Sequence, residues 1–387
     1  MFHQSKTMIG LNLRRVKAVS SKEFIQIKRD PRSLALALLI PIILLLIFGY
    51  ALSLDIDRVH MAIWNQDPSS KFTRDFLLNF QNSNFFSIIA YVDNYRDIER
   101  MIDKGDVMMA LVIPKDFSHF VESEKTASLQ LLVDGSDSNT ATIAMGYVRS
   151  VVSKFNIQLL TNVLAKHGYK PSRKISALTR VWFNMGLNSR WFITPGVIAM
   201  IMMIIAALLT SITVAREWER GTMEQLISTP VKAPELIMGK FLPYFSIGIL
   251  DLFVGVILAR LLFGVPFRGS FVLLVFLSSL FLTGALSQGI FISIVARTQL
   301  MASQLAILTT FIPTMLLSGF IYPIFNMPKF VQAVSYFVPA RYYIVILRES
   351  FLKGSGIETM WDETIFLFLF ATMMLTLAVR RFKKKVA

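Results

Sequence analysis

The chain has 387 residues, and 54% of them are hydrophobic. Its apolar residues gather in runs of about twenty, which excludes an ordinary soluble protein. Lys and Arg number 40 against 25 Asp and Glu, a formal charge of +15. Much of this excess flanks the apolar runs, which favours lipid headgroups over nucleic acid as its partner. The absence of cysteine excludes disulfides and thiolate metal sites, and the four scattered histidines show no metal-ligand spacing.

Residues 1–33 are basic and amphipathic and precede the first long apolar run, residues 34–54. A helix here would carry four apolar residues on one side: Val16, Val19, Phe24 and Ile27. Such a helix suits the plane of the lipid headgroups. The apolar run of roughly 21 residues is long enough to cross a hydrocarbon core of about 30 Å. It is too long for a signal peptide and lacks a small-residue cleavage site, so we expect a first transmembrane helix with a cytoplasmic N-terminus.

Residues 55–190 change character and contain no apolar run long enough to cross a membrane. Short apolar patterns predict strands at 59–65, 86–93, 107–114 and 128–137. Amphipathic patterns predict helices at 71–81, 95–105, 116–124 and about 139–166. Because this region follows a single span from a cytoplasmic N-terminus, we expect an α/β domain outside the cytoplasm, large enough to hold its own core.

Five further apolar runs predict transmembrane helices at about 193–215, 241–262, 271–296, 301–322 and 363–380. The predicted fold is a polytopic α-helical membrane protein with six transmembrane helices and an α/β extracytoplasmic domain inserted between helices 1 and 2. Helices 2–6 occupy residues 191–380. An even number of spans returns the C-terminus to the cytoplasm, where residues 381–387 form a basic tail. Both ends of the chain therefore satisfy the positive-inside rule independently.

A charged segment, residues 216–240, separates the second and third spans on the predicted cytoplasmic side. As a helix it would have a charged face made of Glu217, Glu219, Arg220 and Glu224. Its apolar face would consist of Trp218, Met223, Leu226 and Ile227, and Pro230 and Pro234 would end it. Such a helix either docks into a groove on a soluble partner or binds only lipid. Four basic and four acidic residues make the segment neutral, which favours the protein partner.

No Walker A sequence occurs, because Gly239-Lys240 lacks both the earlier glycine and the following Ser or Thr. Neither HExxH nor GxSxG is present, so no catalytic residue is predicted. Asp251 is the one acid deep in a predicted span, where an unpaired carboxylate costs several kcal/mol. It is either a substrate or proton contact or a packing residue hydrogen-bonded to Gln288 or Gln304.

The apolar stretch 330–347 is broken at Pro339 and Arg341 and is too interrupted for a clean span. Non-helical backbone at membrane depth is tolerated only where protein or water covers it. We therefore expect a re-entrant or interfacial hairpin on the external side of the membrane.

Four stretches carry a resemblance to a known family: KEFIQIKRDPRSLALALLIP at 22–41, REWERGTMEQLISTPVKAPELIMGK at 216–240, LLSGFIYPIFNMP at 316–328 and VSYFVPARYYIVILRESFLKG at 334–354. Together they resemble the permease subunits of ABC-2 type exporters. The similarity is to the multidrug branch, which has a large extracytoplasmic domain between the first two spans. It covers essentially the whole chain, and the stretch at 216–240 is its most specific part.

The resemblance implies that two permease subunits, identical or related, form the membrane channel of an exporter in a bacterial inner membrane. Each would pair with a cytoplasmic ATPase subunit that binds ATP and Mg, while this chain binds no cofactor. The substrate would be hydrophobic or amphipathic, such as a drug or a lipid, and members of this branch often act with a periplasmic adaptor. The family's external re-entrant hairpin corresponds to residues 328–351.

The coupling helix of the family, which contacts the ATPase, corresponds to residues 217–229 of this chain. The contacts implied within it are Glu217, Trp218, Glu219, Arg220, Gly221, Thr222, Glu224 and Leu226. Asp251 and Gln288 remain candidates for substrate contact or packing.

Two other functions are compatible with parts of the sequence. A proton-coupled secondary transporter would use Asp251, but it would be expected to have more intramembrane ionisable residues and an internal repeat. A membrane-anchored receptor or assembly factor would act through residues 55–190 and would need neither six spans nor the charged segment. The exporter permease is the function that the sequence favours.

Overall fold

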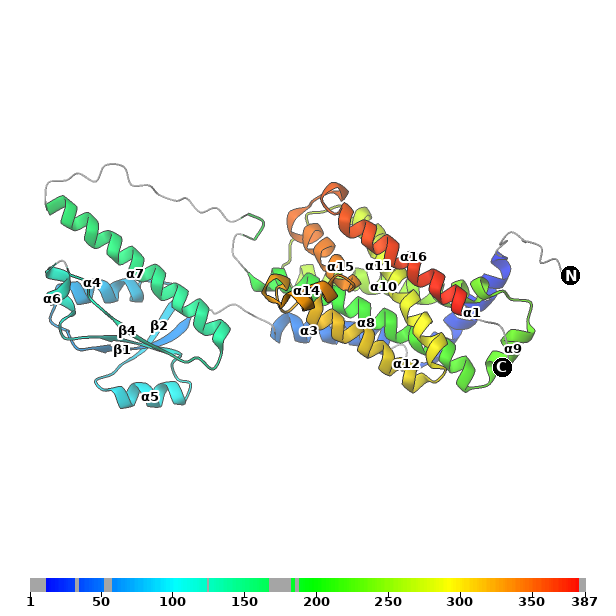
Figure 1. Cartoon of the computed structure of the whole chain (residues 1–387), viewed down its shortest axis with the longest axis horizontal. Helices are drawn as coiled ribbons and strands as arrows, with labels where there is room; N and C mark the ends of the chain where they lie inside the picture. Colours follow the sequence, from blue (N-terminus) through cyan, green and yellow to red (C-terminus); the bar gives the residue numbers. More distant parts are fainter. Residues whose placement is uncertain are drawn as a thin grey trace. The chain divides into compact units, whose positions relative to one another are not determined.

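The computed structural model describes residues 12–31, 35–51, 58–123, 125–166, 182–184 and 188–382. The chain divides into two compact units, residues 55–179 and the remainder, residues 1–54 with 180–387. Each unit has its own hydrophobic core, and each is described by itself (Figure 1).

The unit of residues 55–179 contains a four-stranded sheet. Its elements in chain order are β1 (Val59–Asn65), α4 (Lys71–Gln81), β2 (Phe86–Tyr91), α5 (Tyr95–Asp103), β3 (Met109–Ile113), α6 (Phe117–Glu122), β4 (Gln130–Val133) and α7 (Ser138–Lys166). The strand order is β2-β1-β3-β4, with β1 parallel to both β2 and β3 and with β4 antiparallel to β3. The strands and helices that the sequence predicts for this region are confirmed, with shifts of a few residues at their ends.

Both faces of this sheet are covered by helices (Figure 1). Successive strand residues point to opposite faces, so Met61 and Ile63 pack with α4, α6 and α7, whereas Ala62 packs on the opposite face with Ile98 of α5. All five residues of β3 are buried, as expected for a strand covered on both faces. The apolar runs of this region are therefore explained by a two-sided core rather than by a membrane.

The remaining unit is a bundle of helices. Its elements are α1 (Leu13–Arg29), η1 (Ala35–Leu39), α3 (Ile40–Ala51), α8 (Ser189–Glu219), α9 (Thr222–Ser228), α10 (Ala233–Phe263), α11 (Phe271–Ala296), α12 (Gln299–Ala306), η2 (Ile307–Phe311), α13 (Ile312–Leu317), η3 (Ile324–Asn326), α14 (Lys329–Ser335), α15 (Pro339–Arg348), η4 (Glu349–Lys353), η5 (Ile357–Thr359) and α16 (Trp361–Arg381). Helix α8 is the most buried of the long helices and packs against α3, α10, α11, α12 and α15.

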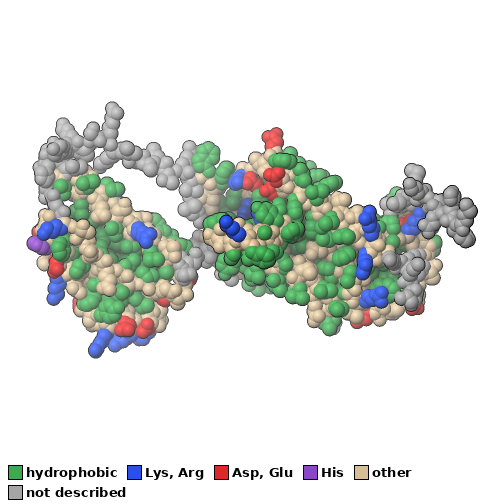
Figure 2. Space-filling view, in the orientation of Figure 1, with side chains coloured by type: hydrophobic (Ala, Val, Ile, Leu, Met, Phe, Trp, Pro, Cys, Tyr) green, Lys and Arg blue, Asp and Glu red, His purple; other side chains and the backbone are tan. Residues whose placement is uncertain are grey.

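Five helices within the described residues are long and apolar enough to cross a membrane: α8, α10, α11, the continuous run from α12 to α13, and α16. They confirm a polytopic helical membrane protein. Figure 2 shows a largely hydrophobic surface along the bundle, with charged side chains gathered toward its two ends. The expected first span, residues 34–54, lies partly outside the described residues, and its described part forms η1 and the short apolar helix α3.

The apolar stretch that was expected to form a hairpin is bent in the structure. Helix α14 and the helical run from Pro339 to Lys353 meet at an angle of 80°. Pro339 begins the second helix, where its missing N–H costs no hydrogen bond. This bend lies at the opposite end of the bundle from α1, α9 and the C-terminal end of α16 (Figure 1).

Candidate functional site

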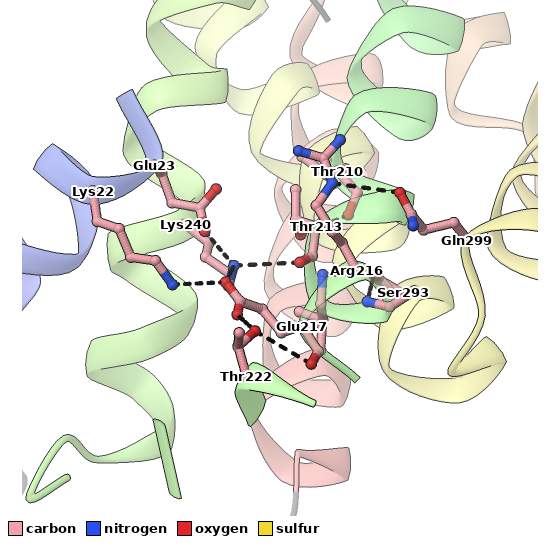
Figure 3. Close-up of polar contacts among 12 residues, drawn as sticks. Lys22, Glu23, Thr210, Thr213, Arg216, Glu217, Thr222, Lys240, Ser293 and Gln299 are labelled. Atoms are coloured by element: carbon pink, nitrogen blue, oxygen red, sulfur yellow. Dashed lines mark hydrogen bonds and ion pairs between the residues drawn. The ribbon is translucent and has the colours of Figure 1, made fainter. Parts of the chain in front are cut away.

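A buried cluster of charged side chains joins α1, α8 and α10 beside α9 (Figure 3). Lys240 of α10 is 1% exposed, and its ammonium forms ion pairs with Glu23 of α1 and, at 3.4 Å, with Glu217 of α8. Lys22 of α1 donates to the same oxygen of Glu217 at 2.9 Å. Each buried charge therefore has a partner of opposite sign, which offsets the cost of removing it from water.

This cluster arises because α8 and α10 are longer than a membrane span. Each has 31 residues. At a rise of about 1.5 Å per residue, roughly 20 residues cross a hydrocarbon core of about 30 Å, so about ten residues of each helix extend beyond it. The sequence predicted a short helix that includes Glu217 and is ended by Pro230 and Pro234, whereas the structure places only Thr222–Ser228 in a separate helix, α9. Glu217 lies on the last turn of α8, and Pro234 begins α10 instead of ending the preceding helix.

Helix α9 is the short turn that connects these two long helices. Gly221 separates it from α8 and has a φ of +71°, a left-handed conformation that glycine adopts without steric cost. The Thr222 hydroxyl then donates to Glu217, which ties the first residue of α9 to the buried cluster. A second acid fixes the other end, because Glu235 accepts from the Lys232 backbone N–H at 2.8 Å at the start of α10.

Helix α1 packs on the bundle rather than lying only among headgroups. Val16, Val19, Glu23 and Ile27 are its buried residues, whereas Phe24 is 55% exposed. The predicted apolar side was therefore wrong at Phe24, because the residue aligned with the buried face is Glu23, which pairs with Lys240. At the start of α1, the Asn12 backbone N–H donates to Glu235 at 3.0 Å. Helix α1 is thus held to α10 at its start and again at Glu23.

The last turn of α8 is also tied to the start of α12. Gln299 donates from its side chain to Glu219 at 2.6 Å and from its backbone at 3.3 Å. Arg216 pairs with Asp30 at 3.4 Å, and the Arg297 guanidinium lies over the Trp218 ring at 5.6 Å. Polar contacts at this end of the bundle therefore connect α1, α8, α9, α10 and α12.

The predicted contact residues divide into two groups. Glu219, Arg220, Gly221 and Glu224 are exposed and accessible to a partner. Glu217 is only 4% exposed, so its assignment to an exposed charged face is wrong. Trp218 and Leu226 pack against the core of the bundle, and Thr222 is partly buried. The side chain of Ile227 lies outside the described residues.

The structure does not join Asp251 to either expected partner. Within the described residues no hydrogen bond connects Asp251 with Gln288, and one side-chain oxygen of each is buried without a partner. Gln304 is exposed. The cavity beside Asp251 has a volume of about 10 Å³ and is otherwise lined by apolar residues and a glycine of α3, α8 and α10. That is room for about one water molecule and no larger solute.

Glu23 and the role of Lys240 were not predicted from the sequence. Glu23 stands among basic residues, yet its spacing from Val16, Val19 and Ile27 places it on the helical face that these residues share. An acid on the apolar face of a basic helix indicates that a buried cation lies opposite it, and the position of Glu23 in the sequence gives this indication. The partner could not be found in the same way, because Lys240 is 217 residues away.

The comparisons with known proteins agree with this architecture. The family described as "ABC-2 family transporter protein" matches residues 31–380. The chain is 37% identical to the probable multidrug ABC transporter permease YbhS of Escherichia coli K12, over 97% of this chain and 98% of the relative. It is 28% identical to the probable multidrug ABC transporter permease YbhR over the whole of both chains. The inner membrane transport permease YhhJ is 28% identical over 75% of this chain and 76% of its own.

These matches confirm the resemblance inferred from the four sequence stretches. The family match includes the charged segment, the long helices on either side of it and the bent pair α14–α15. The chain belongs to the ABC-2 family of transporter proteins.

Proposed function

We propose that the chain is the permease subunit of an ATP-driven exporter in a bacterial inner membrane. Three of its relatives are named as permeases, and one of these as an inner membrane permease. A separate cytoplasmic subunit would bind ATP and Mg, and a second permease copy, identical or related, would complete the pathway. The apolar spans favour a hydrophobic or amphipathic substrate, such as a drug or a lipid, and a periplasmic adaptor would carry it onward.

In this proposal the end of the bundle that carries α1 and α9 faces the cytoplasm. Basic residues occur in the last turns of both α1 and α16, including Lys28, Arg29, Arg380 and Arg381. The positive-inside rule favours the cytoplasmic side for this end. The unit of residues 55–179 and the α14–α15 bend would then lie on the external side, with α14 and α15 as the re-entrant hairpin.

One observation carries the coupling role of α9. Its outer side exposes Glu224, Gln225 and Ser228, while its base is linked through Thr222 to the buried Glu217. Glu217 in turn contacts Lys22 of α1 and Lys240 of α10. A force applied to the exposed side of α9 would therefore act on α1, α8 and α10 together. ATP-driven movement of a partner docked on α9 would change the packing of these helices and so switch access to the pathway.

The test reverses the charge of the exposed side without touching the buried cluster. We expect the double variant Glu224→Arg, Gln225→Arg to reduce copurification with the co-expressed ABC ATPase subunits of the same genome by at least about tenfold, since the few hot-spot residues that dominate an interface each cost about 2 kcal/mol or more when they are altered. Substrate-stimulated ATPase activity should fall in parallel. The thermal unfolding midpoint of the isolated chain should stay unchanged, because both side chains are exposed.

The control is Glu99→Arg, a charge reversal at an exposed position of α5. It should leave both copurification and ATPase activity at the wild-type level. Full retention of the ATPase by the α9 double variant would exclude α9 as the docking element and would remove the main support for the proposed function.

A further inference from the structure

A pocket of about 460 Å³ lies at the end of the bundle opposite α9, within the size range of small-molecule sites. It lies between the start of α8, the chain after α13, helix α15 and the start of α16. The residues that define its character are Phe192, Gly319, Phe325, Arg341, Arg348 and Glu363. None of them belongs to the network around α9.

Arg348 is the central polar residue of this pocket. Its guanidinium carbon lies 3.7 Å from the centre of the Phe192 ring, and one terminal nitrogen donates to the Gly319 carbonyl at a long 3.5 Å. Its Nε is buried and has no hydrogen-bond partner. Among the described residues no carboxylate lies within ion-pair distance of Arg348. A guanidinium has five N–H donors, so most of its capacity is available to an anion.

The second cation of the pocket is also without a carboxylate partner in the described structure. Arg341 donates to the Ser335 hydroxyl at 2.5 Å and lies over the Tyr336 ring at 4.0 Å. Glu363 is the one acid among the residues that line the pocket. The lining therefore carries two cations and one anion, a net positive charge that favours an anionic ligand.

The rest of the lining is mainly apolar. Pro323, Ile324 and Val345 form part of the wall, and the Phe325 ring is 79% exposed. An apolar wall next to a guanidinium suits a molecule with a charged head and a hydrophobic tail. An inorganic anion would use the guanidinium alone and would leave the exposed phenylalanine without a contact.

We propose that this pocket binds an amphipathic anion, with a phosphate, sulfate or carboxylate head at Arg348 and an apolar tail along Phe325. The inference deepens the proposed export function by naming the charge class of the substrate, and it rests on that function only for the statement that the bound amphiphile is transported. The binding itself needs no ATPase, so the two proposals can fail separately.

The test measures binding to the full-length chain in nanodiscs of zwitterionic phosphatidylcholine. Dodecyl phosphate is the probe, and isothermal titration calorimetry is the readout. We expect saturable binding of dodecyl phosphate, at least about tenfold weaker binding of dodecyltrimethylammonium, and no measurable binding of inorganic phosphate at the same concentrations. Equal binding of the anionic and cationic amphiphiles would overturn the proposal.

Two variants and a control locate the site. Arg348→Gln should weaken dodecyl phosphate binding at least about tenfold. The affinity of Arg348→Lys should lie between those of the wild type and Arg348→Gln, because lysine keeps the positive charge but lacks the planar, forked guanidinium. Phe325→Ala should weaken binding severalfold. Because the Phe325 ring is exposed, its removal should not affect folding, and weaker binding can be attributed to the lost contact with the ligand. Arg260→Gln, an exposed arginine on α10 that does not line the pocket, should bind like the wild type. Unchanged binding in both Arg348→Gln and Phe325→Ala would overturn the assignment.

The source of the amphiphile is resolved by competition. If phosphatidylglycerol added to the nanodiscs displaces dodecyl phosphate, the ligand is an anionic membrane lipid. If it does not, the ligand is an amphiphile that is not part of the bilayer. Both results support an anionic amphiphile, and both are independent of whether the ATPase docks on α9.

Discussion

Replacing Lys240 by Met should destabilise the protein by about 3–5 kcal/mol, because it leaves Glu23 buried without its cation and leaves Glu217 with Lys22 alone. Both carboxylates are almost fully buried, so water cannot replace the ammonium. We expect a large fall in the thermal unfolding midpoint in detergent and loss of α1 from the bundle, seen as rapid proteolysis within residues 13–29. A midpoint within the error of the wild type would contradict the buried cluster.

A triple variant separates charge from packing. Lys240→Met combined with Glu23→Gln and Glu217→Gln removes all three charges while keeping similar shapes, and it should recover much of the lost stability. Lys353→Met is the matched single control, because Lys353 pairs with Glu349 through a side chain that is 46% exposed. An exposed pair of this kind contributes about 0–1 kcal/mol. If the control cost as much as Lys240→Met, burial of the cluster would not explain the effect.

Gly289→Leu should prevent the close packing of α8 and α11. A Cβ atom at Gly289 would lie 2.6 Å from the backbone carbonyl oxygen of Ala207 and would also overlap the Thr210 hydroxyl. That hydroxyl donates to Leu286 across the helix pair, so the contact is part of the interface. Overpacking of a close-packed core costs about 1–3 kcal/mol or more. The destabilisation by Gly289→Leu should lie at the upper end of this range, because the Ala207 backbone cannot move aside as a flexible side chain could.

Thermal unfolding in detergent and size-exclusion chromatography would measure this effect. We expect Gly289→Leu to be poorly recovered as a monodisperse protein and Gly289→Ala to show a smaller decrease in the same direction. Gly146→Leu in α7 is the control, because nothing lies within 4 Å of a Cβ there. A Gly289→Leu protein as stable as this control would mean that α8 and α11 do not approach each other as described.

The α/β unit could be predicted almost element by element because its signals are local. The strand at Val59–Asn65 and the helix at Lys71–Gln81 are set by short patterns of apolar residues and by nearby caps, such as Ser70 before α4. The long spans were equally readable from their apolar runs. Neither inference depends on knowing which distant segment packs against which.

The charged segment was harder because its outcome is decided by tertiary contacts. Glu217, Glu219 and Glu224 look alike in the sequence, yet Glu217 is buried, Glu219 bonds to Gln299, and Glu224 is exposed. Their environments differ because α8 extends past the expected membrane boundary and includes Glu217 and Glu219 but not Glu224. The partners in α1 and α12 are too distant in sequence for a local pattern to reveal. Prolines gave a misleading signal, because Pro234 suits the first turn of a helix as well as the end of one.

The composition of the buried cluster has an electrical consequence. Lys22 and Lys240 balance Glu23 and Glu217, so the unit that links α9 to the long helices carries no net charge. Moving one elementary charge through a full membrane potential of 100 mV changes the free energy by about 2.3 kcal/mol, whereas moving a neutral cluster changes it little. A movement of this cluster would therefore add almost no voltage dependence of its own, and any effect of the membrane potential on these helices would come from their other charges, such as Arg14, Arg15 and Lys17 of α1.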